Sequence, residues 1–513
     1  MIDSPTVNLS KMLRWNVVRR GDKEALVDEE KRWSFLQLDQ SVDAHAHALS
    51  SAGVGKGDLV GIVARNSATY LIEIFALARI GAILVPLNFR LHARELSSIS
   101  QRAGISLILC DDEFSDKVNE LLTTGLIHRA VLHSDNAEGL GRNWFALGQL
   151  LSSVGTEKFI DAEVSLSDVQ RILYTSGTTS LPKGVIQTYG NILFNQLGQI
   201  LELELTAQDR ILISAPLFHV SGLEAPGHHA LAAGATVVMT HSYVGKDVID
   251  LCVKERITGM VLAAQILLEI LDIEDLQTRE LSPLRYCIFG GVPKAVRRRF
   301  GEAFPGVRMV DTFGMTELTN GAAYMDQSHE WAKLGAAGTV FPYTEIKIVE
   351  KNGSESPVDT VGEIVARGPK VSPGYWKDLD ATDESWRDGW FHTGDMASMD
   401  EDGYIWFASR EKDMIRSGGE NVASAEIEQI ISEHHAVAEV AVIGIPDPRW
   451  DEVPKAYVVL RIGATLSEQE LIDHCKQGLG GFKVPKEVEF RDSLPRNDSG
   501  KILKRELRAE LEK

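Results

Sequence analysis

The first part of the chain alternates between short apolar runs of strand length and longer stretches with helical spacing. Ser34 and Gln37 form the capping-box pattern that opens many helices. Leu38, Val42 and Leu49 then repeat at helical intervals. We therefore predict a helix that begins after Ser34.

A β-α-β unit is predicted directly after this helix. Residues 59–64 form an apolar run of strand length, and residues 69–80 read as a helix stopped by Gly81. Residues 82–85 form a second strand, closed by Pro86. Such a unit implies a parallel sheet with a right-handed crossover.

The same alternation continues to about residue 290. A helix is predicted over residues 248–254, with Asp247 as its cap. A large layered α/β domain therefore fills about the first two thirds of the chain. Further strands are predicted at residues 107–109, 130–132, 172–174, 185–186, 211–213, 236–239 and 286–289.

After about Gly335 the pattern changes to short strands separated by turns. Residues 345–349, 362–366 and 404–407 predict a smaller β-rich lobe. Beyond a charged segment at residues 410–413, helices and strands mix in a compact α+β domain of about 100 residues. Its predicted helices begin at Ser424 and Ser467, and its predicted strands are residues 440–443, 456–460 and 488–490.

Composition narrows the class of protein. The chain has 513 residues, 44% of them hydrophobic and 25% charged, as expected of a globular protein with more than one domain. Its net charge of −20 argues against a large nucleic-acid or anionic-membrane surface, which would need clustered Lys and Arg. The four cysteines are widely spaced, so we expect neither a disulfide framework nor a zinc site, and a reducing cytoplasm fits best.

We expect neither a signal peptide nor an integral membrane segment. The first residues lack the basic-then-apolar pattern of a signal, and no apolar run is long enough to span a bilayer. We expect a monomer or a homodimer.

A run of small and hydroxyl residues, residues 174–184, lies between two predicted strands. Its backbone and hydroxyls can direct several donors at one anion, and Lys183 adds a mobile positive charge. It is not a Walker A loop, because Lys183 precedes Gly184 and no helix signal follows. A solvated surface loop is the competing interpretation. The hydroxyl residues are Thr175, Ser176, Thr178 and Thr179.

Two further motifs follow predicted strands. His219 lies where open parallel sheets bind ligands, although a hydrogen-bonded structural histidine is an alternative. Gly290 and Gly291 permit close approach of a flat ligand, or simply form a turn.

Residues 311–317 combine three kinds of ligand chemistry. Phe313 offers a face for a purine, Thr316 a hydroxyl for a phosphate, and Glu317 a hard oxygen for Mg²⁺. A surface acidic loop is the alternative, weakened by the apolar pair Met309-Val310 that leads into the motif.

Three residues in the last third of the chain complete the candidate chemistry. Asp395 ends a turn with a carboxylate suited to the two hydroxyls of a ribose, and Arg410 could share that ribose. Lys501 follows a glycine turn that would hold it at a defined point, whereas most terminal lysines are solvated charges.

Taken together, these motifs resemble the adenylate-forming superfamily of acyl-CoA synthetases, adenylation domains and firefly luciferase. The resemblance covers nearly the whole chain. It is carried by Gly57-Asp58, Asn66, residues 174–184, His219, residues 311–317, Asp395, Arg410, residues 418–421 and Lys501.

The resemblance implies an α/β fold with a large multi-lobed N-terminal domain, residues 1–411, and a small mobile α+β C-terminal domain, residues 412–513, with the pivot at Lys412. It also implies the reaction of an acyl-CoA ligase, in which a carboxylic acid and ATP give an acyl-adenylate and CoA then displaces AMP. Lys501 would bridge the carboxylate and phosphate, and Thr178 and Glu317 would hold Mg²⁺.

The resemblance also implies which residues form the site. His219, Thr316, Glu317 and Lys501 would be catalytic. The nucleotide and CoA would be bound by Thr175, Ser176, Gly177, Thr178, Thr179, Lys183, Gly290, Gly291, Val292, Pro293, Asp311, Thr312, Phe313, Gly314, Met315, Asp395, Arg410, Gly418 and Gly419.

Three residues depart from the family pattern. Ser180 and Ser409 stand where glycine is usual, and Phe313 replaces the commoner tyrosine. Because the two serines bear on ATP handling and domain rotation, an enzyme that only makes the thioester from a preformed acyl-adenylate is an alternative. A non-catalytic relative that binds AMP or an acyl-adenylate is a second one.

The expected substrate is a small-molecule carboxylic acid. Phe218 stands where amino-acid-activating relatives carry aspartate, which disfavours an amino acid. Residues 260–265, together with Gly290 and Gly291, suggest a roomy apolar pocket. We therefore expect a bulky hydrophobic acid, either aryl, terpenoid or steroid-derived, ahead of a linear fatty acid.

Overall fold

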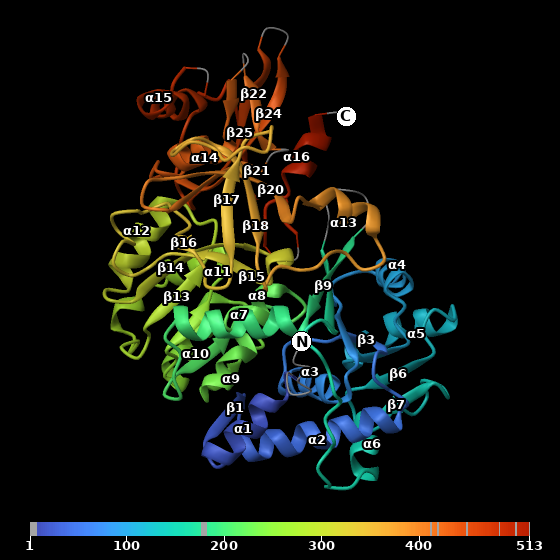
Figure 1. The fold of residues 1–513 in the computed structure, drawn as a ribbon. Coiled ribbons are helices and arrows are strands. Elements are labelled where there is room, and N and C mark those ends of the chain that lie inside the picture. Colours follow the sequence, from blue (N-terminus) through green and yellow to red (C-terminus); the bar gives the residue numbers. More distant parts are fainter. Residues whose placement is uncertain are drawn as a thin grey trace.

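The computed structural model describes residues 8–175, 182–410, 413–417, 420–447, 450–481, 483–497 and 500–511. Figure 1 shows a large N-terminal part, with a smaller C-terminal part in orange and red at its upper end. The four sheets divide between these two parts. The predicted fold class, a multi-lobed α/β domain followed by a small α+β domain, is confirmed.

A seven-stranded sheet lies in the N-terminal part, with strand order β7-β6-β5-β3-β4-β8-β9. All neighbours are parallel except β8 and β9, which form an antiparallel hairpin. Its strands are β3 (Leu59–Val63), β4 (Ile83–Pro86), β5 (Leu107–Cys110), β6 (Arg129–Leu132), β7 (Trp144–Ala146), β8 (Val169–Thr175) and β9 (Lys183–Thr188).

A nine-stranded sheet has the order β16-β15-β14-β13-β12-β10-β11-β1-β2 and is parallel from β1 to β14 through β11, β10, β12 and β13. Its strands are β1 (Glu24–Asp28), β2 (Lys31–Ser34), β10 (Arg210–Ile213), β11 (Thr236–Met239), β12 (Gly259–Val261), β13 (Tyr286–Phe289), β14 (Arg308–Met315), β15 (Asn320–Tyr324) and β16 (Thr339–Val340).

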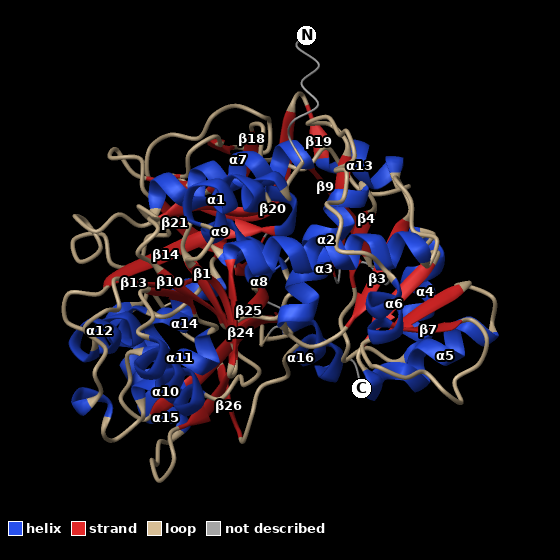
Figure 2. Cartoon of the chain, turned by 90° about the horizontal axis from the view of Figure 1, so that it is seen from below, coloured by secondary structure: helices blue, strands red, loops and turns tan. Residues whose placement is uncertain are grey.

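Helices cover both faces of the two large sheets. Alternate strand residues enter different cores: Ile62 belongs to a core shared by both sheets, whereas Val63 belongs to a core under α4 and α5. A third core lies between the nine-stranded sheet and α10–α12. Figure 2 shows α2 and α3 between these outer helix groups. The helices are α1 (Lys11–Arg20), α2 (Phe35–Ser51), α3 (Ala68–Ile80), α4 (Ala93–Ala103), α5 (Ser115–Thr123), α6 (Leu147–Ser153), α7 (Tyr189–Glu202), α8 (Val220–Glu224), α9 (Ala230–Ala233), α10 (Gly245–Glu255), α11 (Ala264–Leu271) and α12 (Lys294–Ala303), with short 3₁₀ turns η1 (Asp112–Phe114), η2 (Gly227–His229), η3 (Leu276–Thr278) and η4 (Thr316–Leu318).

The predicted β-rich lobe is a five-stranded antiparallel sheet beside β14 and β15. Its core includes Phe313 and Leu318, and these two side chains join the lobe to the end of β14. Its elements are β17 (Glu345–Val349), β18 (Gly362–Arg367), α13 (Leu379–Ser385), β19 (Trp386–Arg387), β20 (Trp390–Met399) and β21 (Ile405–Arg410).

The C-terminal part has its own five-stranded sheet and its own cores. It contacts the N-terminal part where the Lys294 backbone N–H donates to Gln429 Oε1 at 3.1 Å. Lys412 lies outside the described residues, so the hinge stays a prediction. The elements are β22 (Ile415–Ser417), β23 (Glu420–Val422), α14 (Ser424–Ser432), β24 (Val437–Asp447), β25 (Asp451–Leu460), α15 (Glu468–Gly478), β26 (Glu487–Arg491) and α16 (Lys504–Leu511).

Local signals predicted these elements well, with one clear error. The Ser34–Gln37 capping box forms as expected, and Gly81 ends α3 in the left-handed conformation, with φ 78°. The predicted Asp247 cap is wrong: α10 begins at Gly245 with Val244 as its N-cap residue, and Asp247 lies in the first turn. An acidic residue there still favours the helix dipole. In the described part of the chain, no helix is long and apolar enough to cross a membrane.

Candidate active site

Glu317 lies in η4, directly after β14, and is only 7% exposed. The Tyr375 hydroxyl donates a hydrogen bond to Glu317 Oε1 at 2.9 Å. Burial raises the pKa of the Glu317 carboxyl, and the nearby Asp395 charge adds to this rise. The Lys183 charge and the hydrogen bond from Tyr375 lower the same pKa without cancelling the rise. Two carboxylates and a lysine from three separate strands or turns therefore converge here.

The predicted anion loop connects β8 to β9. Thr175 at the end of β8 pairs with Lys183 at the start of β9, which brings the two ends of the loop together. Lys183 Nζ lies 4.8 Å from the centre of the Tyr375 ring, so the lysine and Glu317 share one neighbour. Residues 176–181, among them Ser176, Gly177, Thr178, Thr179 and Ser180, lie outside the described residues.

His219 is the N-cap residue of α8, which follows β10. Its Nδ1 accepts a hydrogen bond from the Ser221 backbone N–H at 3.3 Å and lies 2.8 Å from Ser221 Oγ. Because Nδ1 acts as the acceptor, we assign the proton of the neutral ring to Nε2. Burial lowers the pKa of His219 to about 4, and the positive charge of Lys501 contributes to the lowering.

Asn66 holds the segment that carries His219. Its amide nitrogen donates to the Ala215 carbonyl at 2.9 Å, and its side-chain oxygen accepts from the Leu217 backbone N–H at 2.8 Å. The Asn66 side chain is buried, so these bonds do not compete with bulk water. Asn66 therefore fixes the approach to α8 from the neighbouring sheet.

Lys501 comes from the C-terminal part and is exposed, yet its charge acts on His219 in the N-terminal part. Lys501 therefore acts electrostatically across the boundary between the two parts. Asp395 is buried and pairs in register with Arg410 across β20 and β21. The Arg410 side chain, and the residues Gly418 and Gly419, lie outside what the structure describes.

The residues expected around a purine lie after the end of β13 and in the last part of β14. Gly290 and Gly291 are exposed at the end of β13, and a Cβ on Gly290 would lie 2.9 Å from the Thr312 carbonyl oxygen, so glycine is required there. Phe313 is buried and stacks on Phe407, with 6.4 Å between ring centres. Val292 is buried, whereas Pro293, Thr312 and Met315 are half-buried and Gly314 is exposed.

Asp311 has a partner that the sequence did not indicate. Its carboxylate forms a buried ion pair with Arg297 of α12. Burial nevertheless raises the pKa of Asp311 to about 6, with Arg297 and the Thr312 backbone N–H opposing the rise. The Asp311 side chain is therefore engaged in packing α12 against β14.

The residues present suit a magnesium ion bound together with a nucleotide. Among the described residues, no group of three or more His, Cys, Asp or Glu forms a metal cluster. Magnesium at nucleotide sites commonly uses one or two carboxylates plus substrate phosphates. Glu317, whose pKa is raised partly by the Asp395 charge, provides such a carboxylate, and a cation would relieve that repulsion. Thr178, the other predicted ligand, lies outside the described residues.

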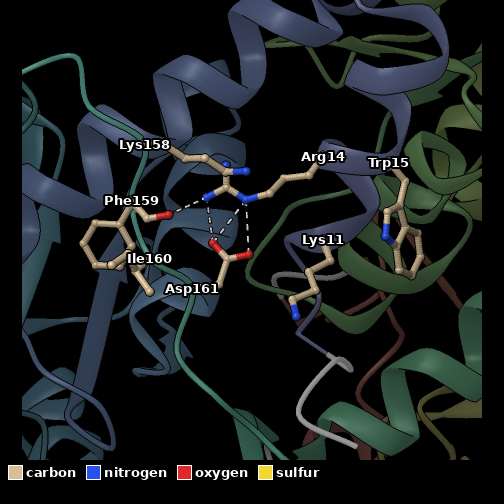
Figure 3. Close-up of a pocket in the computed structure, with 7 residues that line it drawn as sticks. All are labelled: Lys11, Arg14, Trp15, Lys158, Phe159, Ile160 and Asp161. Atoms are coloured by element: carbon tan, nitrogen blue, oxygen red, sulfur yellow. Dashed lines mark hydrogen bonds and ion pairs between the residues drawn. The ribbon is translucent and has the colours of Figure 1, made fainter.

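A surface pocket lies elsewhere, between α1 and residues 158–161 (Figure 3). Figure 3 shows the Arg14 guanidinium pointing to Asp161 and to the Phe159 carbonyl, with Trp15 and Lys11 on the other side of the opening. None of the predicted site residues lines this pocket. We assign it no part in the chemistry.

The AMP-binding enzyme family matches residues 13–376, and the AMP-binding enzyme C-terminal domain matches residues 426–501. The chain belongs to the AMP-binding enzymes. Feruloyl-CoA synthase of Amycolatopsis sp is 36% identical to it over 475 residues, which cover 93% of each chain.

Two solved structures of this family are also similar. The anthranilate CoA ligase AuaEII in complex with anthranoyl-AMP has a TM-score of 0.91 at 26% identity, over 98% of this chain and 97% of that one. The O-succinylbenzoate coenzyme A synthetase of Bacillus subtilis, in complex with ATP and magnesium ion, has a TM-score of 0.85 at 31% identity, over 97% and 99%.

These findings confirm the predicted activity. This AMP-binding enzyme is an acyl-CoA ligase that forms an acyl-adenylate, and its cofactors are ATP, Mg²⁺ and CoA. It acts on a small-molecule carboxylic acid. Whether Ser180 and Ser409 weaken the adenylation step stays a prediction, because residue 180 and the Ser409 side chain lie outside the described residues.

Sequence reasoning missed the residues that support the site. Tyr375, which bonds Glu317, and Arg297, which pairs with Asp311, carry no motif of their own. Part of the pocket prediction also needs correction: Met260 and Leu262 enter the core under α10, whereas Ala263 and Gln265 are exposed. A β-strand turns alternate residues to opposite faces, so Met260 cannot line a pocket with Val261.

Proposed function

We propose that this enzyme activates a bulky aryl carboxylic acid, and that Glu317, Lys183, His219 and Lys501 form the site of adenylation. One geometric observation carries the site assignment: Tyr375 donates to Glu317 Oε1 at 2.9 Å, and its ring centre lies 4.8 Å from Lys183 Nζ, so the lysine and the carboxylate share one neighbour. The charge of Lys501 in addition lowers the pKa of His219. We propose that adenylation takes place in this arrangement of the two parts.

In the first half-reaction, a carboxylate oxygen bonds to the α-phosphorus of ATP and the bond to the leaving pyrophosphate breaks. Two anions meet in this step, so cationic groups must offset their repulsion. Lys501 is proposed to bridge the carboxylate and phosphate oxygens, and Lys183 with its loop to hold the pyrophosphate. Glu317 is proposed to hold Mg²⁺, which screens the phosphates when it is bound.

The nucleotide is proposed to lie between Gly290–Gly291 and β14. Phe313, with one face on Phe407, provides an aromatic edge there, and Asp395 with Arg410 is proposed to bind the ribose. Asp311 would contribute only through the backbone, because its carboxylate is paired with Arg297. Two observations support this assignment. These residues lie at the ends of β13 and β14, and the two glycines are exposed.

In the second half-reaction the CoA sulfur bonds to the acyl carbon and AMP leaves. We propose that the domains, residues 1–411 and 412–513, rotate about Lys412, which withdraws Lys501 and brings Gly418 and Gly419 to the cleft. A cytoplasmic location is proposed as well, because all four cysteines are free and buried, as expected in a reducing compartment.

The aryl preference is supported by relatives whose names specify ferulate, anthranilate and O-succinylbenzoate. These acids favour the aryl class over the terpenoid, steroid and linear classes. Phe218, which contacts Phe89 edge-to-face with 5.3 Å between ring centres, stands just before His219 in place of an acidic group for an ammonium, which supports a substrate other than an amino acid.

A substrate panel tests this proposal. The enzyme is incubated with ATP, Mg²⁺, CoA and aryl, terpenoid or linear saturated acids, and pyrophosphate and CoA thioester are measured separately. We expect both products at the highest kcat/KM with an aryl acid. A preference for linear acids would refute the aryl assignment. Thioester formed only from a supplied acyl-adenylate would indicate the non-adenylating alternative. If neither product forms although AMP binds, the non-catalytic alternative is indicated.

A further inference from the structure

Glu224, the last residue of α8, is the centre of a buried polar cluster. Its side chain is 0% exposed, as are those of Arg171 and His229. Glu224 Oε1 lies 2.7 Å from an Arg171 terminal nitrogen, and Oε2 lies 2.6 Å from His229 Nε2. Asn195 of α7 also donates to Oε2 at 3.2 Å. We call Arg171, Asn195, Glu224 and His229 the Glu224 cluster.

The Glu224 cluster joins elements that are far apart in the sequence. Arg171 lies in β8 of the seven-stranded sheet, and α8 follows β10 of the nine-stranded sheet. The Glu224 carbonyl accepts hydrogen bonds from Asn195 at 3.2 Å and from Asn320 of β15 at 3.3 Å. One residue therefore connects both large sheets with α7 and β15.

Strand β8, helix α8 and strand β15 each carry or adjoin a residue of the proposed site. Strand β8 leads from Arg171 to Thr175 and the anion loop. Helix α8 has Glu224 at one end and His219 at the other. Asn320 follows η4, which holds Thr316 and Glu317. The positions of Thr175, His219 and Glu317 are thus linked through the Glu224 carboxylate and carbonyl.

The charges in the Glu224 cluster depend on each other. Burial alone would raise the pKa of Glu224, but Arg171 and His229 outweigh burial and lower it to about 2. Arg171 also donates from Nε to Gln170 at 2.5 Å, which fixes the plane of its guanidinium. A buried charge that loses its partner is costly, so the members cannot move independently.

We infer that Glu224 and Arg171 are positioning residues that hold Thr175 and Lys183, the described ends of the anion loop, in register with His219 and Glu317. The pair does not touch substrate. This inference rests on the site assignment proposed above. The inference predicts an effect on the adenylation step, because only this step releases pyrophosphate from the loop. Thioester formation from acyl-adenylate does not use the loop.

The test compares Glu224→Gln with Glu73→Gln. Glu73 of α3 is also 0% exposed and contacts a buried histidine, His133, at 3.0 Å. His133 lies after β6, and its other ring nitrogen contacts Asp111, which lies after β5. Strands β3 and β4 separate both of these strands from β8. Glu73→Gln therefore removes a buried carboxylate of the same kind outside the elements that carry the site.

Four quantities are measured for each full-length variant: thermal midpoint, KM for ATP, the rate of pyrophosphate release, and the rate of thioester formation from a supplied acyl-adenylate. For Glu224→Gln we expect at least a tenfold loss in kcat/KM for ATP and less than a threefold loss in thioester formation. For Glu73→Gln we expect a lower thermal midpoint with both half-reactions within threefold of wild type.

An equal loss of both half-reactions in Glu224→Gln, or the same pattern in Glu73→Gln, would overturn the inference. If Glu224→Gln does not fold, Arg171→Lys replaces it, because lysine keeps the charge and cannot bond Gln170 and Glu224 together. The same criteria apply to it. Lys501→Ala is included as a reference: normal adenylation in that variant would refute the site assignment, whereas the comparison of Glu224 with Glu73 still decides the positioning role.

Discussion

Glu224 and Glu317 are both buried carboxylates in the N-terminal part, and their pKa values shift in opposite directions. The pKa of Glu224 falls to about 2, although burial raises it, because Arg171 and His229 contact both oxygens. The pKa of Glu317 rises, because burial and the Asp395 charge exceed the effects of Tyr375 and Lys183. Both residues are buried, so their different partners account for the opposite directions of the two pKa shifts.

This difference fits the separate roles proposed for the two residues, positioning for Glu224 and Mg²⁺ binding for Glu317. Glu224 has a cation, Arg171, supplied by the protein, and its negative charge is already offset. Glu317 has a neutral donor on one oxygen and a second carboxylate nearby, so its charge is offset best by an external cation. Two buried glutamates are thus suited to different tasks.

The largest effect is expected for Glu317→Gln. Removing the carboxylate should lower adenylation roughly 100-fold or more, because phosphate charge is then no longer offset through Mg²⁺. The thermal midpoint should change little, since the ionised form of Glu317 is disfavoured by burial. Pyrophosphate release is measured across a Mg²⁺ titration. Glu330→Gln is the control, because the pKa of Glu330 is also raised by burial and its carboxylate accepts from the Met309 backbone N–H. A similar loss of adenylation in Glu317→Gln and Glu330→Gln would contradict the specific role proposed for Glu317.

A large effect on stability is expected at Glu224. Because its folded pKa of about 2 lies below the ordinary 4.5, its contribution is fully present above pH 4.5 and is lost as pH falls toward 2. The contribution is on the order of 3 kcal/mol at neutral pH. The gap in stability between wild type and Glu224→Gln should therefore narrow between pH 4.5 and 2 in urea titrations. A constant gap would contradict the assigned pKa.

A moderate effect is expected on His219 itself. Burial and the Lys501 charge lower its pKa to about 4, so the ring stays neutral from pH 5 to 8. Lys501→Ala removes one of these causes and should raise the His219 pKa toward its ordinary value. NMR titration of histidine-labelled protein, with His219→Gln to assign the signal, measures the change. An unchanged pKa would show that Lys501 is not directed to the site in solution.

The smallest effect is expected for Tyr375→Phe. The hydroxyl that bonds Glu317 Oε1 lowers the pKa of that carboxyl. Loss of the hydroxyl should therefore raise this pKa further and shift the acid limb of the pH–rate profile of adenylation to higher pH. We expect a loss of about threefold to tenfold in rate, the size of one hydrogen bond. Tyr404→Phe, which removes a comparable bond to Asp326, is the control and should leave the limb in place.

Much of the fold could be predicted because buried parallel strands are apolar runs and helices begin at capping residues. The β-α-β unit around β3, α3 and β4 is an example. Strand order could not be predicted. Strand β1 pairs with β11, which lies far along the chain, and nothing local to either strand indicates this pairing.

The site was predictable where residues form motifs, as at residues 311–317, and unpredictable where partners are distant. Tyr375 approaches Glu317, and Arg297 approaches Asp311, only because β14 packs against other elements. The Glu224 cluster likewise depends on contacts between two sheets. A hint does exist in α7, whose buried residues include Asn191, Asn195, Gln196 and Gln199, because buried polar side chains need partners.

The central claim is that adenylation depends on a lysine delivered by the C-terminal part. The most direct test measures pyrophosphate release and thioester formation from supplied acyl-adenylate in Lys501→Ala, with Lys486→Ala, an exposed lysine of the same domain, as the control. We predict that Lys501→Ala lowers pyrophosphate release roughly 100-fold and leaves thioester formation within threefold of wild type. Equal losses in both half-reactions, or a similar loss in Lys486→Ala, would contradict the claim.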